Sequence, residues 1–414
     1  MGIMRTKNKK LVPAAILTSH TIGLGVIRAL GKMGVPIYVF YYEPFDFGYL
    51  SKFVNKKIFA HHPEKSEQQF IELLMENAPK SERCLLIPVD DATVLIVSKH
   101  KSLLENYYLV ACPEFEITTK FINKQNTYEL AKKIGVPIPK TCFPECLTDL
   151  EKYAHSVKYP CLVKPNQSHQ FVEIFKEKMF VVDNYGQMFN AFKAAKAAGV
   201  SVMIQELIPG DDRLCYNYNS YFWNGEPLVE FTAEKVRLSE AGFGVPTVVQ
   251  SCSNNDKMRK AAQIFLKALG YYGYSCTEFK KDTRDGIYKL LEVNGRFNRS
   301  GLLSVKCGLN FPWILYNHLI NGVIPDSAAN YQSKIFWIDE FKDLSTILSY
   351  LLKNRFSMIR FLQPYLKKKI FAVFDISDPL PFIKRFFDMF KKLYQKIISD
   401  FHLQQAKLNW SYKK

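Results

Sequence analysis

The stretch CTEFKKDTRDGIYKLLEVNGRFNRS, at residues 276–300, constrains this chain more than any other segment. Two strand-like runs flank a turn at residues 284–286, whose glycine is free to adopt the positive φ that tight turns need. Successive side chains of a strand point to opposite faces, so Glu292 and Asn294 share one face. A three-residue loop at 284–286 places Glu278 directly opposite Glu292. The sequence therefore predicts a hairpin with two facing carboxylates.

Two carboxylates in opposed positions repel each other and weaken a sheet, and a hard divalent cation between them removes the conflict. Mg²⁺ usually takes one or two carboxylates from the protein, while substrate phosphates supply further ligands. Glu278, Glu292 and the neutral oxygen of Asn294 are therefore predicted to hold magnesium and, with it, a nucleotide. The alternative is an ordinary exposed hairpin whose charges meet water, which a short motif does not exclude.

The length of 414 residues predicts two or three domains, and a charged content of 23% is typical of a globular protein. The nine cysteines are scattered, without a paired CxxC zinc motif, which predicts a reduced, cytoplasmic protein. The net charge of +17 favours anionic ligands in general. No nucleic-acid-binding motif is present, so we expect no nucleic-acid partner.

The first 115 residues alternate between strand and helix patterns, which predicts a parallel α/β sheet of the Rossmann-like kind. A GxG motif at Gly23 follows the first strand, but Arg28 stands where a dinucleotide fingerprint has its third glycine. Glu43, about 20 residues beyond, is placed as the ribose-binding acid of such a fingerprint. A tight turn and a dinucleotide-binding loop both fit this segment.

Asp90 and Asp91 close the next buried run. They lie where ligands bind at the carboxyl end of a parallel strand, or they cap a helix. Beyond residue 115 the patterns predict further elements in this order: a helix at 118–135, strands at 159–165 and 179–182, a helix at 186–198, a strand at 201–208, antiparallel strands over 216–252, and a helix at 255–269.

Five motifs then follow one another: Lys124 before VPIPKT, YPCLVKP, IQELIPGDD, CTEF and LLEVNGRFNRSG. In this order and at these spacings, residues 118–322 resemble the ATP-grasp superfamily, in particular its carboxylate–amine ligase branch, which includes D-aspartate ligase. The resemblance implies an α/β domain followed by an α+β fold. The implied parts are a Rossmann-like domain at 1–115, an ATP-grasp domain at 116–330 with a lid at about 140–205, and a basic helical extension at 331–414.

The resemblance also implies a role for each motif residue. The residues implied to bind ATP are Lys124 and Lys164 at the phosphates, Gln205 with the backbone of Glu206 and Leu207 at the adenine, and Asp212 at the ribose. The implied metal ligands are Glu278, Glu292 and Asn294, for Mg²⁺ with Mn²⁺ as the alternative. The implied catalytic residues are Arg296, beside the transferring phosphate, and Arg237, at a phosphate or substrate carboxylate. A surface ion pair is the alternative for Arg237.

The flap over the phosphates is usually rich in glycine in this family, whereas residues 166–178 read NQSHQFVEIFKEK and contain none. This departure predicts a stiffer flap and leaves its backbone–phosphate contacts in doubt. Lys176 and Lys178 are the two candidates that could compensate.

Residues 331–414 contain 16 Lys and Arg against 7 Asp and Glu, interleaved with Phe, Leu and Ile. A basic amphipathic helix of this kind fits the surface of an anionic membrane. The alternative is a helix packed on the core with a solvated basic face. The first interpretation predicts peripheral contact at the inner membrane face.

The motifs together predict an ATP-dependent ligase that joins a small-molecule carboxylate to an amine through an acyl phosphate, acting on an amino acid or a cell-envelope precursor. One alternative is an oxidoreductase that binds NAD(P) through the N-terminal GxG motif. The other is a non-catalytic protein that binds nucleotide or membrane, for which the glycine-free flap is the argument.

Overall fold

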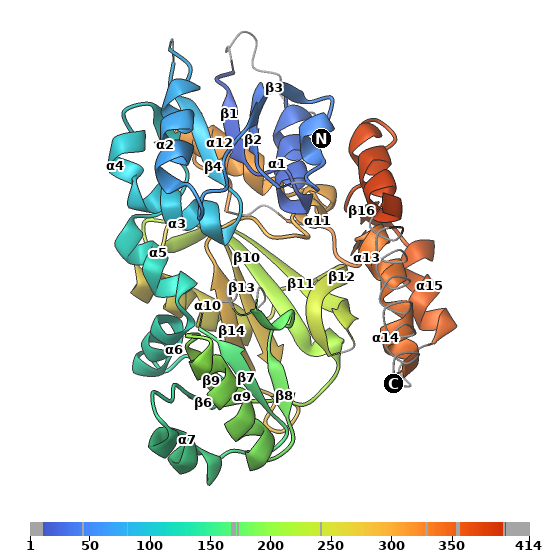
Figure 1. Cartoon of the computed structure of the whole chain (residues 1–414). Coiled ribbons are helices and arrows are strands. Elements are labelled where there is room, and N and C mark those ends of the chain that lie inside the picture. Colours follow the sequence, from blue (N-terminus) through green and yellow to red (C-terminus); the bar gives the residue numbers. More distant parts are fainter. Residues whose placement is uncertain are drawn as a thin grey trace, which may run out of the picture.

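Figure 1 shows the computed structural model of the chain. The structure describes residues 11–43, 45–80, 82–166, 171, 174–240, 242–327, 330–352, 357–391 and 394. Three sheets, of five, four and seven strands, carry the fold. Over the part of the chain that is described, no helix combines the length and apolarity needed to cross a membrane.

All strands of the N-terminal sheet are parallel, in the order β3-β2-β1-β4-β5. The chain adds β2 and β3 on one side of β1 and then β4 and β5 on the other side, as in doubly wound sheets. Its strands and helices are β1 (Ala14–Leu17), α1 (Thr21–Gly31), β2 (Ile37–Tyr41), η1 (Gly48–Leu50), β3 (Val54–Phe59), α2 (Glu67–Glu76), β4 (Cys84–Pro88), α3 (Asp91–Lys99), α4 (Lys101–Leu104) and β5 (Tyr108–Val110). Both faces are buried, because Ile16 and Leu17 enter different cores. This burial explains the continuous apolar run of β1.

The lid is a four-stranded antiparallel sheet in the order β6-β9-β7-β8. It occupies the region where the sequence predicts a lid, and comprises β6 (Thr141–Cys142), α7 (Leu147–Ala154), β7 (Cys161–Pro165), β8 (Phe180–Val182), α9 (Tyr185–Ala197) and β9 (Val202–Glu206). Its buried side chains, among them Leu150, Val163 and Phe192, form a hydrophobic cluster of their own. The lid is therefore a separate packing unit.

Two helices lead from the N-terminal sheet to the lid, α5 (Phe115–Ile122) and α6 (Lys124–Lys133). The single helix predicted at 118–135 is therefore wrong. Asn123 interrupts it, because its side chain accepts a hydrogen bond from the N–H of Gln125 at 2.9 Å and caps α6. The interruption places Lys124 at the first position of a helix.

The large sheet has the order β14-β13-β10-β11-β12-β15-β16. Its elements are η2 (Asp212–Leu214), β10 (Cys215–Trp223), β11 (Glu226–Glu240), β12 (Phe243–Cys252), α10 (Asp256–Leu269), β13 (Gly273–Lys281) and β14 (Tyr288–Asn294), followed by α11 (Leu302–Cys307), α12 (Phe311–Asn321), β15 (Phe336–Ile338), α13 (Glu340–Ser345), α14 (Ile347–Leu352), α15 (Met358–Leu366) and β16 (Lys369–Phe371). β15 pairs with β12, and β16 pairs with β15. The sequence predicts a helical segment after residue 330. The structure shows that this segment also contributes two strands, which complete the large sheet.

One core joins the N-terminal sheet to the large sheet. Leu303 of α11 and Leu315 of α12 belong to the same buried cluster as Ile16 of β1 and Trp337 of β15. In Figure 1, α11 lies below α1, at the level between the two sheets, and α12 lies behind the N-terminal sheet; both helices contact α1. The predicted boundary at residue 115 therefore separates segments that share a core.

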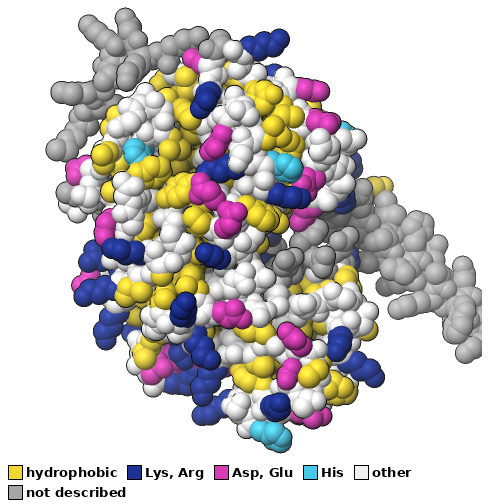
Figure 2. All heavy atoms as spheres, turned by 90° about the vertical axis from the view of Figure 1, so that its left-hand side faces the viewer, with side chains coloured by type: hydrophobic (Ala, Val, Ile, Leu, Met, Phe, Trp, Pro, Cys, Tyr) yellow, Lys and Arg dark blue, Asp and Glu magenta, His cyan; other side chains and the backbone are white. Residues whose placement is uncertain are grey.

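Positive charge is spread unevenly over the surface. Figure 2 shows the face made by the left-hand side of Figure 1, where Lys and Arg are denser over the lower half, at the level of α6 and the lid. Asp and Glu are mixed with them higher up, over the N-terminal sheet. The excess of positive charge therefore favours anions near the lid.

A buried ion pair fastens the C-terminal segment to α1. Arg28 is 2% exposed and Asp378 is 1% exposed, and their side chains bond at 2.9 Å. The same guanidinium donates to the carbonyls of Val373 and Asp378, each at 2.8 Å. Ser51 and the N–H of Lys52 also bond to the carboxylate of Asp378. Arg28, which occupies the third-glycine position of the fingerprint, thus holds the C-terminal segment against α1.

Replacing Asp378 by Asn should lower the free energy of unfolding by about 3–5 kcal/mol, because it leaves the Arg28 charge buried without a counter-ion. Lys32→Met is the matched control, since Lys32 and Asp375 join the same two segments at 2.7 Å but Lys32 is 49% exposed. Its cost should stay below about 1 kcal/mol. Urea unfolding of the two variants measures the contrast, and equal losses would contradict it.

Candidate active site

A cavity of about 170 Å³ lies between the lid and the large sheet. Seven of the predicted site residues line it, from four separate parts of the chain: Lys124, Lys164, Gln205, Glu206, Leu207, Glu278 and Glu292. Apolar side chains supply much of the remaining wall, among them Leu162, Met179, Ile208, Leu238 and Leu291. Motifs far apart in the sequence therefore converge on a single cavity with a charged end and an apolar part.

The hairpin of β13 and β14 forms the charged end. Glu278 and Glu292 are direct partners across the two strands, as the sequence predicts. Asn294 lies two residues beyond Glu292, opposite Cys276, and is 8% exposed. The two carboxylates and the amide therefore lie along one face of the hairpin.

The loop of this hairpin differs from the prediction. The N–H of Asp282 bonds to the carbonyl of Ile287 at 2.8 Å, so the loop is residues 283–286, one longer than predicted. By itself this loop would pair Glu278 with Leu291. A bulge at Leu291 shifts the register by one residue and restores the predicted pair. The Tyr128 hydroxyl of α6 donates to the carbonyl of Leu291 at 2.7 Å, which stabilises the bulge.

Lysines from separate elements offset the charge of the two carboxylates. Lys235 of β11 contacts Glu278 directly, and Lys124 of α6 lies 3.4 Å from Glu292. Burial opposes ionisation of Glu292, but Lys124 and then Lys164 outweigh it and hold its pKa below the usual range. The repulsion expected of the bare pair is thus already relieved by protein cations.

Lys235 is a site residue that the sequence reasoning missed. It is 7% exposed, and its contact with Glu278 overcomes the effect of burial and holds its pKa above the usual range. Its position gives a usable signal. Ala233 and Lys235 lie two residues apart on β11, so both point to its buried face. A lysine on a buried face needs a counter-charge nearby.

Lys164, at the end of β7, faces the same charges from the lid. Its ammonium donates to the side-chain oxygen of Gln205 at 3.1 Å, and Gln205 donates to the Thr141 hydroxyl at 3.0 Å. Burial lowers the pKa of Lys164 to about 8, and the neighbouring Lys124 acts in the same direction. The carboxylates of Glu278 and Glu292 therefore do not fully offset the positive charge of the lysines around them.

Glu206 ties the lid to the hairpin. Its carboxylate accepts from Arg284 at 2.8 Å and from Lys289 at 3.1 Å, and both cations also bind the fully buried Asp282. The backbone N–H of Glu206 donates to the carbonyl of Lys140 at 2.9 Å. That N–H is therefore already bonded, so the predicted backbone contact of Glu206 with an adenine edge concerns its carbonyl, and Leu207 lies on the cavity wall.

Asp212 lies outside the cavity lining and holds backbone together. Its carboxylate accepts from the N–H of Leu238 at 3.2 Å and of Gly242 at 2.9 Å, and from the hydroxyl of Tyr350. Three of about four acceptor positions on the carboxylate are used. The predicted contact with a ribose hydroxyl is left with one position on a side chain that is 6% exposed.

Arg237 takes part in a different structure from the one predicted. Its guanidinium bonds to both oxygens of Asp343 in α13, at 2.7 and 3.0 Å, and stacks on the ring of Phe361. Arg237 is 6% exposed and Asp343 is fully buried. This geometry gives no support to the predicted contact of Arg237 with a phosphate or substrate carboxylate. Arg237 does form an ion pair, but the pair with Asp343 is buried rather than on the surface.

Arg296 lies between the hairpin and the N-terminal sheet. It binds both oxygens of Asp91 at 2.7 and 3.1 Å, while the charge of Glu292 also acts on it. Asp90 caps α3, as one of its two interpretations predicts, and Asp91 begins that helix. Arg296 is thus within reach of the charge of Glu292, a predicted metal ligand, and has a carboxylate partner in Asp91.

No family model matches the chain. A curated relative, D-aspartate ligase of Enterococcus faecium, is 27% identical over an alignment of 283 positions, which covers 63% of this chain and 65% of that protein. The chain thus spans somewhat less than two thirds of its length.

Solved structures match over a larger part of the chain. L-amino acid ligase from Bacillus licheniformis gives a TM-score of 0.59 at 17% identity, covering 77% of this chain and 78% of that one. Biotin carboxylase from Campylobacter jejuni, in its β-γ-ATP complex, gives a TM-score of 0.62 at 16% identity, covering 78% and 74%. The chain has the ATP-grasp fold. The resemblance read from the five motifs is therefore confirmed at the level of the fold.

In this ATP-grasp fold the hairpin residues suit a hard cation. Glu278, Glu292 and Asn294 offer oxygen ligands only, which is what Mg²⁺ prefers. No cluster of three or more His, Cys, Asp or Glu side chains that could hold a metal occurs in the described ranges. Two carboxylates with one amide leave coordination positions for phosphate oxygens, as is usual for protein-bound Mg²⁺.

The glycine-free flap is anchored by aromatic side chains. Residues 167–170 and 172–173 lie outside the described residues. Phe171 is fully buried, and its ring lies 4.6 Å from that of Phe175 and 5.0 Å from that of Phe180. Of the two candidate lysines, Lys178 is the one whose pKa is affected by the charges of Glu292 and Glu278, although its side chain is exposed. These contacts favour Lys178 as the flap residue that faces the site.

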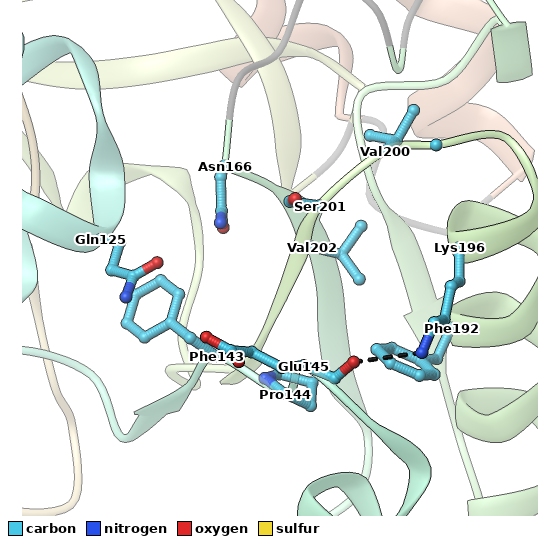
Figure 3. A pocket seen from close by; sticks show the side chains of 11 residues that line it. Gln125, Phe143, Pro144, Glu145, Asn166, Phe192, Lys196, Val200, Ser201 and Val202 are labelled. Atoms are coloured by element: carbon cyan, nitrogen blue, oxygen red, sulfur yellow. Dashed lines mark hydrogen bonds between the residues drawn. The ribbon is translucent and has the colours of Figure 1, made fainter.

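A second hollow, of about 370 Å³, separates the lid from α6 (Figure 3). Gln125 and Asn166 line it, and Lys196 donates to the carbonyl of Glu145 at 3.2 Å across one side. None of the predicted site residues lies on its wall. The hollow leaves space next to the lid, so the lid is loosely packed on this side.

Lys164→Met should raise the stability of the ligand-free protein at pH 7 by on the order of 1–3 kcal/mol, because it removes a charge held at an unfavourable pKa. The unfolded lysine titrates near 10.4, so between pH 8 and 10.4 the unfolded state binds more protons and the stability of the wild type rises with pH. The advantage of the variant should therefore shrink across this range. Denaturant unfolding from pH 7 to 10 measures it.

Lys193→Met, an exposed lysine on α9, is the matched control and should show no such pH-dependent difference from the wild type. An advantage of Lys164→Met that stays constant from pH 7 to 10 would contradict the assigned charge.

Proposed function

We propose that this protein is an ATP-dependent carboxylate–amine ligase with Mg²⁺ as its metal, and Mn²⁺ as the alternative. The observation that carries the proposal is the convergence of seven motif residues on one cavity, with two facing carboxylates and three lysines at its charged end. Its apolar part fits a purine ring. The similarity to D-aspartate ligase makes an acidic amino acid the first candidate for the carboxylate substrate.

Two displacements make up the proposed reaction. A carboxylate oxygen attacks the γ-phosphorus of ATP, the bond to the bridging oxygen breaks, and ADP leaves. The amine nitrogen then attacks the acyl carbon, loses its proton, and displaces inorganic phosphate to leave an amide. Bound Mg²⁺ would neutralise charge on the phosphates. Most of the contribution of the protein is positioning and electrostatic stabilisation.

Each charged residue has a place in this scheme. Glu278, Glu292 and Asn294 hold the metal, and Lys124, Lys164 and Lys235 compensate the phosphates. Gln205 and the segment at Leu207 contact the adenine. Arg296 stabilises charge on the transferring phosphate. The parallel N-terminal sheet serves as the Rossmann-like domain that precedes the ATP-grasp domain.

The two alternatives have less support. For an oxidoreductase, Glu43 would have to bind a ribose, but its carboxylate lies 3.4 Å from His62. Gly23 is explained by packing, since a Cβ there would come within 2.2 Å of the carbonyl oxygen of Thr18. A non-catalytic protein would have no need of the paired carboxylates. Binding of NAD⁺ rather than ATP in a titration would reverse this order.

The ligase proposal predicts that phosphate release from Mg–ATP depends on both an acidic amino acid and an amine acceptor. Glu292→Gln should abolish it while the protein stays folded, because the site loses charge that the cation needs. The rise in melting temperature caused by Mg–ATP should also shrink, following ligand linkage. Phosphate release and melting curves, each with and without Mg–ATP, test both statements.

Lys193→Met is again the control and should retain both the activity and the shift. Wild-type phosphate release in Glu292→Gln would remove the hairpin from the catalytic site. A normal melting shift with no release would place the defect in a later step.

We further propose that the C-terminal segment contacts an anionic membrane. Residues 380–391 are helical, and their exposed apolar side chains include Phe387, at 65%, and Phe390, at 49%. Ile359 and Leu366 of α15 are exposed by 84% and 81%. Basic residues accompany this surface, which suits anionic lipid. The other side of the C-terminal segment is held to the core, by Asp378 bonded to Arg28 and by Arg385 bonded to Asp339. Membrane contact and packing on the core can therefore both apply, each to one side of the segment.

Vesicles that contain anionic lipid should therefore bind the protein, and binding should fall with salt. Phe387→Gln with Phe390→Gln should weaken it, because each removes exposed apolar surface. The control is Phe59→Gln, which removes a ring that is 68% exposed on β3. Co-sedimentation measures binding. Equal behaviour of the double variant and the control would exclude this surface as the contact.

A further inference from the structure

A buried carboxylate outside the cavity, that of Asp339, is shared by two arginines. Asp339 is fully buried and caps α13, where it accepts from the N–H of Lys342 at 3.2 Å. Arg299, which follows β14, contacts one oxygen, and Arg385 of the C-terminal helical segment contacts the other at 3.3 Å. Cations from two distant parts of the chain thus meet at one negative group.

The positive charge of this cluster exceeds the negative charge. The Lys342 ammonium makes no ion pair with any residue that the structure describes, and the buried Nε of Arg299 has no hydrogen-bond partner there. Glu340, the next carboxylate, has its pKa raised to about 6 by burial, and one of its oxygens accepts from the N–H of Phe374. Two carboxylates therefore accompany three cations, and neither the Lys342 ammonium nor the Nε of Arg299 is paired with a carboxylate among the described residues.

The chain joins this cluster to the hairpin, because Arg299 follows Asn294, the last residue of β14, by five residues. Lys178 of the flap feels the charges of Glu292 and Arg299, and Lys342 feels those of Arg299 and Lys178. Arg385 also donates to the hydroxyl of Thr21 at 3.1 Å, at the first residue of the eleven-residue helix α1. The positive end of that helix adds to the field. The cluster is thus linked to the hairpin through Arg299 and to the first turn of α1 through Arg385.

We propose that Arg299, Lys342 and Arg385 form a second anion-binding subsite, which holds a non-reacting carboxylate or phosphate of a substrate. The proposal rests on the ligase function, because it takes the reacting carboxylate to lie at the metal-ligand pair. Lys124, Lys164 and Lys235 already serve the phosphates of ATP, so the second cluster is left for the other substrate. The subsite would select substrates that carry two anionic groups.

The charge state of Lys342 also favours binding of an anion at the cluster. Burial, followed by the charge of Arg299, lowers the pKa of Lys342 to about 8. An ammonium in such surroundings gains from a bound anion. The C-terminal segment supplies Asp339, Lys342 and Arg385, so it would belong to the active site as well as to the fold.

The test uses the full-length protein saturated with Mg²⁺ and a non-hydrolysable ATP analogue, so that the first phosphate site is filled. Melting temperature is followed against succinate, which stands for a carboxylate ligand, and against inorganic phosphate. Lys342→Gln should weaken binding of the preferred anion by about tenfold or more, the loss expected for one charged hydrogen bond. The control is Lys367→Gln, an exposed lysine of the same segment, which should bind as the wild type does.

The anion that stabilises the wild type identifies the source of the negative group. Equal binding in Lys342→Gln and the wild type, or no stabilisation of the wild type by either anion, would overturn the subsite. If Lys342→Gln does not fold, Lys342→Met replaces it, since the ammonium has no counter-ion to leave behind. In a turnover assay, the variant should raise KM for the anionic substrate and leave kcat within about threefold.

The two proposals fail in different ways. A wild type that is not stabilised by the ATP analogue contradicts the ligase function, whatever the anions do. A wild type that binds the analogue, with anion binding unchanged by Lys342→Gln, contradicts the subsite alone.

Discussion

The facing carboxylates of Glu278 and Glu292 set the condition that the rest of the site satisfies. Such a pair repels across a hairpin unless cations surround it. The fold brings these cations from separate elements: Lys124 from α6, Lys164 from the lid and Lys235 from β11. The lysines in turn repel one another, which contributes to the low pKa of Lys164. Added phosphates and a divalent cation would relieve both kinds of repulsion together.

Local patterns predict part of this site. Strand alternation places Glu292 and Asn294 on one face. Apart from Glu278, the other predicted residues that line the cavity are implied by the resemblance to the ATP-grasp superfamily rather than by any local pattern. The pair of carboxylates is predicted correctly although the loop is predicted one residue too short. The bulge at Leu291 makes up the difference, and it depends on the Tyr128 hydroxyl of α6, a contact that no local pattern contains.

The contacts that the sequence does not predict share a physical cause, which is distance along the chain. Asp212 and Arg237 look like ligand-binding residues within their motifs, but Tyr350 and Asp343 bind them from more than 100 residues away. Strands of three residues such as β15 and β16 are too short to show a periodicity, and they are ordered by pairing, β15 with β12 and β16 with β15. The C-terminal segment therefore looks helical in the sequence, although it completes the sheet.

The lid has its own packing and is joined to the hairpin by charged contacts. The lid has its own hydrophobic cluster, so it can move without exposing the core shared by the two larger sheets. Charged contacts of Glu206 with Arg284 and Lys289 join it to the hairpin, and polar interfaces of this kind permit relative motion. Opening would carry Lys164 away from the other lysines and relieve their repulsion. Phosphates in the cavity would reverse that preference, so the charge that recognises the ligand would also close the lid.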